Sequence, residues 1–131
     1  MNYLSPEFSA QDINKLSILA LAYIGDGVFE LMVRTKLTTE DHSSALDLHR
    51  TAISIVNAVS QSGYADTLLP LLTDEEISVY KRGRNAKVNS VPKNASVADY
   101  HKATGFEALF GYLYLSGNKE RLAELFSHLD I

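Results

Sequence analysis

Two stretches of this chain place a single acidic side chain among apolar residues and glycines. The first, LAYIGDGVFE (residues 21–30), carries Asp26 between two glycines, and the second, HKATGFEALFGYLYL (residues 101–115), carries Glu107. Both read as largely buried helices, where a carboxylate costs several kcal/mol unless it is paired, hydrogen-bonded or metal-bound. Two such helices in contact would bring two carboxylates into one pocket, as a hard divalent cation requires.

The glycines on either side of Asp26 need a reason of their own. Glycine inside a helix costs roughly 1 kcal/mol against alanine, so the pair indicates that another backbone, a metal shell or a phosphate comes close. An alternative stays open at this point, in which Asp26 is a buried acid satisfied by a neighbouring Arg or Lys. Glu30 and Arg34 are four residues apart and favour an ordinary ion pair on the helix surface.

Positive charge gathers in the basic segment, residues 81–102, directly before the second acidic stretch. This segment holds six Lys or Arg side chains against one acid, although the net charge of the whole chain is −4. One basic segment on an acidic protein indicates a localised phosphate contact rather than general coating of nucleic acid. The alternative is a solvated loop whose lysines only keep the protein soluble.

Three motifs resemble one family. LAYIGDGVFEL is similar to the signature helix of the ribonuclease III catalytic domain, TGFEALFGYLYL is similar to that family's second acidic helix, and KRGRNAK lies between them. The order matches, and the resemblance covers residues 16–125. With no room for more, the chain resembles the Mini branch of this family, which lacks a double-stranded-RNA-binding domain.

The resemblance assigns Asp26 and Glu107 as the catalytic carboxylates that hold magnesium (Mg²⁺). Full-length members have a further glutamate four residues before that aspartate and an aspartate three residues before that glutamate. Here those positions are Ala22 and Thr104. More of the metal shell must therefore come from water, RNA phosphate or main chain, and we expect weaker metal binding than in the full-length enzymes.

The resemblance also implies a function. We expect a magnesium-dependent endoribonuclease that hydrolyses double-stranded RNA without a protein nucleophile, as a homodimer whose two sites face one groove. The implied substrate is the precursor of large-subunit (23S) ribosomal RNA, and a ribosomal protein on that RNA is a further candidate partner. The side chains that we expect to contact RNA are Lys81, Arg82, Arg84, Asn85, Lys87, Lys93 and Lys102.

Two functions of other classes stay open. The first is a catalytically inactive ribonuclease III-like RNA-binding module, suggested by Ala22 and Thr104. The second is a metal-independent ribonuclease that uses Arg121 and His128, because an arginine, six residues and a histidine form the motif of an all-α nuclease class.

Composition limits the class of protein. The 131 residues, 46% hydrophobic and 21% charged, are typical of one globular domain, residues 1–131. There is no cysteine, which excludes disulfides and thiolate chemistry. The N-terminus has no secretion-signal pattern and no apolar run could cross a bilayer, so we expect a cytoplasmic protein without a membrane partner.

The helical patterns predict an all-α fold with six or seven helices. No stretch alternates with the period of a strand. The expected features are a Ser9 cap before a first helix, a helix over 16–37, a polar connection over 38–44, a helix over 45–62 stopped by Gly63, a helix over 64–72 broken near Pro70, a helix capped by Thr73, and a loop over 83–98.

Overall fold

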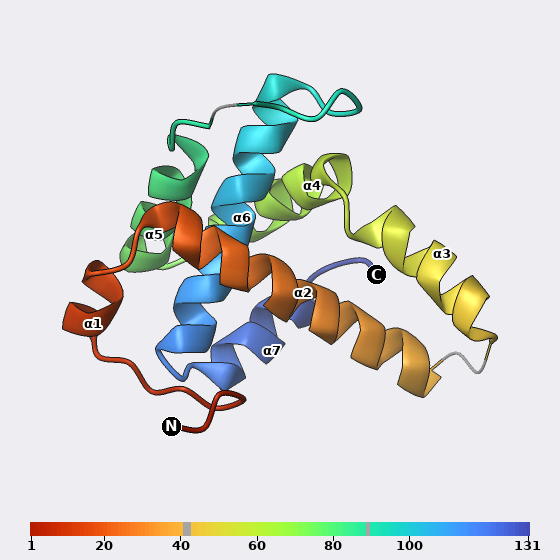
Figure 1. Cartoon of the computed structure of the whole chain (residues 1–131), viewed down its shortest axis with the longest axis horizontal. Coiled ribbons are helices and arrows are strands. Elements are labelled where there is room, and N and C mark those ends of the chain that lie inside the picture. The colour runs from red at the N-terminus through yellow and green to blue at the C-terminus, as the bar shows by residue number, and fades with distance from the viewer. Residues whose placement is uncertain (41–42, 89) are drawn as a thin grey trace.

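All regular structure in the described part of the chain is helical (Figure 1). The computed structural model describes residues 1–40, 43–88 and 90–131. Its elements are α1 (Ala10–Asn14), α2 (Ile18–Glu40), α3 (Ala45–Ile55), α4 (Ala58–Leu68), a 3₁₀ turn η1 (Leu69–Leu71), α5 (Asp74–Arg84), α6 (Val97–Leu115) and α7 (Lys119–Ser127). The predicted all-α fold is confirmed. None of the described helices is long and apolar enough to span a membrane.

Helix α6 lies in the middle of the molecule, with α2, α4 and α5 packed around it (Figure 1). Three aromatic rings hold the contact between α2 and α6. The rings of Phe106 and Phe110 meet the edge of Phe29 at centroid distances of 5.0 and 5.5 Å, and all three side chains are fully buried. Edge-to-face contacts of this kind add to the burial of large apolar area, so α2 and α6 form the centre of the core.

The main chains of α2 and α6 touch at two glycines. A Cβ atom on Gly25 would lie 1.7 Å from the carbonyl oxygen of Glu107, and one on Gly111 would lie 1.9 Å from the carbonyl oxygen of Leu21. The expected close approach of another backbone is therefore confirmed for Gly25. Around Gly27 the chain itself leaves open space, because no atom lies within 4 Å of the place of its Cβ.

Helix α2 is longer than predicted. Residues 38–40 belong to the helix rather than to a polar connection, and Asp41 and His42 lie outside the described residues. The hydroxyl of Thr39 donates to the carbonyl oxygen of Thr35, and Lys36 pairs with Glu40 at 2.8 Å. These i to i+4 contacts satisfy polar groups along the last turns and favour continuation of the helix.

The predicted helix over 45–62 is wrong, because two helices occupy this range. The chain leaves α3 after Ile55, and the Asn57 side chain accepts a hydrogen bond from the Ser60 amide at 2.9 Å. That bond is an N-cap, which starts a new helix. Gly63 lies inside α4 and does not end a helix, contrary to the prediction.

Other helix boundaries agree with the sequence. Ser9 and Thr73 both cap helices through capping boxes, with Asp12 and Glu76 as the reciprocal partners. The expected break near Pro70 is the 3₁₀ turn. The loop between α5 and α6 spans residues 85–96, shorter than the predicted 83–98 because residues 83–84 belong to α5 and residues 97–98 to α6. Asn89 within it lies outside the described residues.

Gly25→Ala should destabilise the fold by at least about 1–3 kcal/mol, because the added methyl group overlaps the main chain of α6 and the two helices must separate. Gly63→Ala is the matched control, since nothing lies within 4 Å of its Cβ position on α4. This control should stabilise by about 0.5–1 kcal/mol through helix propensity. Urea denaturation measures both changes, and equal effects would contradict the close crossing.

Candidate active site

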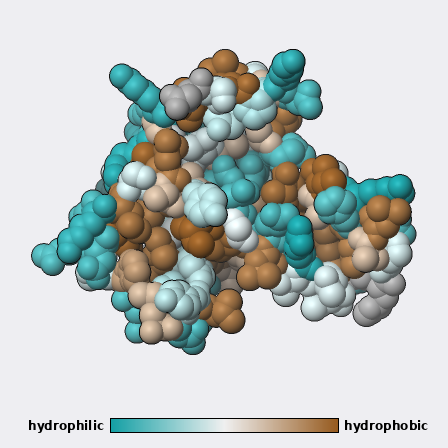
Figure 2. Space-filling view, viewed as in Figure 1, coloured by the Kyte–Doolittle hydropathy of each residue, from teal (hydrophilic) through white to brown (hydrophobic). Residues whose placement is uncertain are grey.

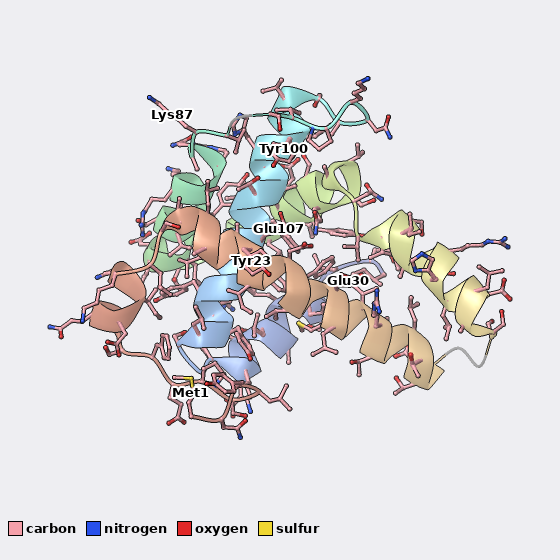
Figure 3. All side chains as sticks on the ribbon, in the orientation of Figure 1. Met1, Tyr23, Glu30, Lys87, Tyr100 and Glu107 are labelled. Atoms are coloured by element: carbon pink, nitrogen blue, oxygen red, sulfur yellow. The ribbon has the colours of Figure 1, made fainter. Side chains whose placement is uncertain are left out.

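The crossing of α2 and α6 brings together the two acids expected from the sequence. Asp26 follows Gly25, whose backbone touches the Glu107 carbonyl, and the Asp26 and Glu107 carboxyl groups are hydrogen-bonded to each other. Figure 3 places Glu107 beside α2, where α6 passes behind it. The glycine contact therefore fixes the separation of the two carboxyl groups as well as that of the helices.

The surroundings of Glu107 strongly disfavour its charged form. Burial, then the hydrogen bond to Asp26, then the charge of Asp26 raise the pKa of Glu107 from 4.5 to about 9. At neutral pH Glu107 consequently keeps its proton. A divalent cation could replace that proton and remove the repulsion, which is the condition under which both groups ionise together.

The expectation that Asp26 is buried is wrong, because its side chain is exposed. Successive residues of a helix are turned by about 100°, so Gly25 faces α6 while Asp26 emerges at the edge of the contact. Among the described residues no ion pair includes Asp26, and the alternative of neutralisation by Arg or Lys is not supported. The expected surface pair of Glu30 and Arg34 is present at 2.8 Å.

The donor set of the pair fits magnesium in part. Carboxylate oxygens are the ligands that a hard cation prefers. Within the described ranges no third acidic or histidine side chain completes a metal-binding group. Ala22 is buried, and the Thr104 hydroxyl donates to the Tyr100 carbonyl at 2.9 Å. Asp26 and Glu107 would therefore hold the ion together with water or substrate oxygens.

Four of the seven predicted RNA-contacting side chains stand free at the surface. Lys81 and Arg82 lie on α5, and Lys87 and Lys93 lie in the loop that follows. All four are exposed, and none is ion-paired with a described residue. Figure 3 shows Lys87 projecting from the end of the molecule where this loop runs.

The other three members of the predicted set make contacts within the chain. Arg84 lies over the Tyr80 ring at 5.7 Å and donates to the Asn85 side chain at 3.2 Å. Lys102 donates to Asp66 on α4 at 2.6 Å, and this hydrogen bond raises the pKa of Lys102. Its charge is thus largely balanced by Asp66, a pairing that no local sequence pattern predicts.

Arg121 is part of a structural network rather than a second catalytic site. Its Nε and Nη2 atoms donate to the two carboxylate oxygens of Glu76 at 2.9 and 2.8 Å. Although burial opposes it, the bonds from Arg121 hold the pKa of the buried Glu76 below its usual value. His128 is exposed at the end of α7. Arg121 is therefore held in a structural ion pair with Glu76, which does not support its catalytic role in the metal-independent alternative.

Comparison with known proteins identifies one family. The family model described as the Ribonuclease III domain matches residues 19–118. "Mini-ribonuclease 3" of Clostridium tetani is 44% identical over 94% of this chain and 82% of its own length, and "Mini-ribonuclease 3" of Symbiobacterium thermophilum is 48% identical over 82% of each. The crystal structure of protein FN1578 from Fusobacterium nucleatum is 30% identical, with a TM-score of 0.80 over 88% of this chain and 93% of that one.

An all-helical domain with two acids at the crossing of its central helices is the architecture of an RNA-cleaving hydrolase of the matched class. The chain belongs to the ribonuclease III family, and within it to the Mini-ribonuclease III branch. The expectation of an endoribonuclease is confirmed with the family.

Glu107→Gln should make the free energy of unfolding less dependent on pH. The pKa of Glu107 is about 9 in the folded chain against an ordinary value of 4.5. Between these values the folded chain keeps a proton that the unfolded chain has lost, so stability falls as pH rises, by at most about 1.4 kcal/mol per unit. The uncharged amide removes this loss, and the variant should melt higher than the wild type at about pH 8.

Denaturation between about pH 5 and pH 9 in the presence of a chelator measures the effect. Glu120→Gln, which removes an exposed acid on α7, should leave the slope of the wild type unchanged. A slope that Glu107→Gln does not alter would show that this carboxyl group titrates normally.

Proposed function

We propose that this protein is a magnesium-dependent endoribonuclease that cleaves double-stranded RNA. The observation that carries the proposal is the position of Glu107, where burial and then the neighbouring Asp26 raise its pKa to about 9. Two acids pressed together in this way are unfavourable unless a proton or a cation lies between them. In the proposed site, a magnesium ion would be that cation.

The chain's own residues have distinct parts in the reaction. Glu107, held by α6 and half-buried, gives the site a fixed oxygen donor, and the exposed Asp26 gives it a second donor that faces solvent and substrate. When bound, magnesium supplies activation of a water molecule and stabilisation of charge on the phosphate. Asp26 and Glu107 would orient the ion against the scissile phosphate, and no side chain needs to act as nucleophile.

Asp26→Asn should abolish cleavage while leaving the fold intact, because the amide has nearly the same shape but is a poor ligand for a hard cation. The measurement is cleavage of a labelled RNA duplex with magnesium and with a chelator, alongside the melting temperature. Wild-type turnover by Asp26→Asn, or cleavage that persists in the chelator, would refute the mechanism. Binding without cleavage by the wild type would instead favour the inactive module.

The exposed cations of α5 and its loop are the proposed contacts to the RNA backbone. A-form duplexes are recognised mainly through shape, phosphates and 2′-hydroxyl groups. Lys81, Arg82, Lys87 and Lys93 offer positive charge that forms no ion pair with any described acid. Arg84 and Asn85 would contribute from beside Tyr80, whereas Lys102 would first have to leave Asp66.

Replacing Lys81, Arg82 and Lys87 with Ala should weaken duplex binding and lower its salt dependence by roughly one unit of slope per lost phosphate contact. Binding is measured in the Asp26→Asn background at several salt concentrations. Lys119→Ala removes one positive charge at the start of α7, far from the loop in Figure 1, and should leave the slope unchanged. If the triple variant keeps the salt dependence of the wild type, the basic segment is only a solvated loop.

A stripe of exposed residues along α2 supports the proposed homodimer. Leu19, Tyr23 and Leu31 are 41%, 84% and 57% exposed, and Gly27 completes the four-residue spacing. Hydrophobic side chains appear at the surface over α2 in Figure 2. A two-fold axis near the middle of this helix would place Tyr23 of each copy against the open space at Gly27 of the other, beside Asp26.

Sedimentation at micromolar concentration should give about twice the chain mass of 14.5 kDa. Tyr23→Ala should shift the equilibrium toward the monomer, because the most exposed large side chain of the stripe is the strongest candidate anchor. Tyr3→Ala, which removes an equally exposed tyrosine from the N-terminal segment, is the control and should leave the mass unchanged. A wild-type monomer under these conditions would contradict the two-site arrangement.

We further propose that the natural duplex lies in the precursor of large-subunit (23S) ribosomal RNA, that a ribosomal protein on that RNA assists cleavage, and that residues 1–131 act as one cytoplasmic domain. The similarity to the Mini-ribonuclease III branch supports this context. Mapping the ends of 23S ribosomal RNA in cells that lack the protein tests it, and mature ends in such cells would refute it.

A further inference from the structure

Helix α5 is fastened to the rest of the molecule at its N-terminal half. Glu76 receives two hydrogen bonds from Arg121 of α7, and Glu75 accepts one from the Tyr112 hydroxyl of α6 at 2.5 Å. Arg121 also donates to the Leu71 carbonyl oxygen at 2.8 Å, just before the helix begins. Because bidentate pairs fix orientation as well as distance, this end of α5 has little freedom to slide.

The C-terminal half of α5 lies directly on α6, and two glycines allow the close contact. A Cβ atom on Gly83 would lie 2.8 Å from the Ala108 Cβ and 2.9 Å from the Gly105 Cα. A Cβ atom on Gly105 would in turn lie 2.6 Å from the Tyr80 carbonyl oxygen. Both glycines are buried. Any larger residue at either position must push α5 away from α6.

This contact lies between two groups that the reaction must coordinate. Gly83 directly follows Lys81 and Arg82, the exposed cations of α5, and Gly105 comes two residues before Glu107. The outer side of α5 thus offers charges to the RNA backbone, while its inner side rests on the helix that carries the acid pair. The distance between the α5 and α6 backbones at this contact therefore determines how far Lys81 and Arg82 lie from the carboxyl groups of Asp26 and Glu107.

We infer that Gly83 and Gly105 are positioning residues for cleavage, which hold the phosphate-contacting cations of α5 in register with Asp26 and Glu107. The inference rests on the proposed function. Displacement of a reacting group by about 1 Å can cost about a hundredfold in rate, whereas long Lys and Arg side chains can follow a phosphate over such a distance. A shift of α5 should therefore slow cleavage of bound RNA more than it weakens binding.

The test uses Gly83→Ala, Ala108→Gly and the double variant, which moves one methyl group across the contact. Gly63→Ala on α4 is the control for a helical glycine without neighbours. Single-turnover cleavage is measured at saturating duplex RNA, well below the melting temperature. RNA affinity is measured with each substitution placed in the Asp26→Asn background.

Gly83→Ala should slow cleavage at saturating RNA at least about tenfold while changing affinity by less than about threefold. The double variant should regain part of the rate, because the nearest clash, with the Ala108 Cβ, is relieved. Gly63→Ala should match the wild type. If Gly83→Ala does not fold, Tyr112→Phe, which loosens the other end of α5 by one hydrogen bond, should show the same split in milder form.

Three results would overturn the inference. An unchanged rate at saturating RNA with a lowered melting temperature would make the glycines purely structural. Parallel losses of affinity and rate would show that α5 only binds. A double variant as slow as Gly83→Ala would show that register across this contact is not the cause. A wild-type protein that cleaves no duplex at all would instead refute the proposed function.

Discussion

The direct contact between the main chains of α2 and α6 is the constraint on which the rest of the structure depends. At Gly25 and Gly111 there is no room for a single methyl group, so the two helices cross at the shortest distance that their backbones allow. The aromatic cluster around Phe29 fills the space on one side of this crossing, and the acid pair occupies its edge. Close backbone approach thus stabilises the core and also holds the two acidic side chains near each other.

Burial of Glu107 beside Asp26 is the reason for proposing a cation at this site. An acid whose pKa is raised to about 9 lowers the stability of the metal-free protein at neutral pH, and such a cost persists only where the surroundings enforce it. Here the glycine crossing enforces it. Because Ala22 and Thr104 offer no further carboxylate, the proposed ion would be held by only two acidic side chains. Water and RNA oxygens would then complete its shell, which couples metal binding to substrate binding.

The helices and the two acids could be predicted from the sequence, but the burial and the contacts of individual side chains could not. Asp26 and Glu107 were identifiable because each interrupts an apolar helical pattern beside glycine, and the helix caps followed from short local motifs. Which acid is buried was not identifiable, since this depends on the direction from which α6 approaches α2. The engagement of Lys102 by Asp66, 36 residues earlier in the chain, is likewise a product of tertiary packing. The start of a new helix after Asn57 could have been predicted, because asparagine is a preferred N-cap residue. Its side chain accepts a hydrogen bond from the amide three residues later, here that of Ser60.

The same device recurs on the other side of α6. Gly83 and Gly105 bring α5 against α6 as Gly25 and Gly111 bring α2 against it, so the central helix packs closely on two neighbours at glycines. Backbone contacts of this kind cannot relax by changing rotamers, unlike contacts made by long side chains. The spacing between α5 and the two helices that carry Asp26 and Glu107 is therefore set by backbone packing at glycines, and it changes only if whole helices move.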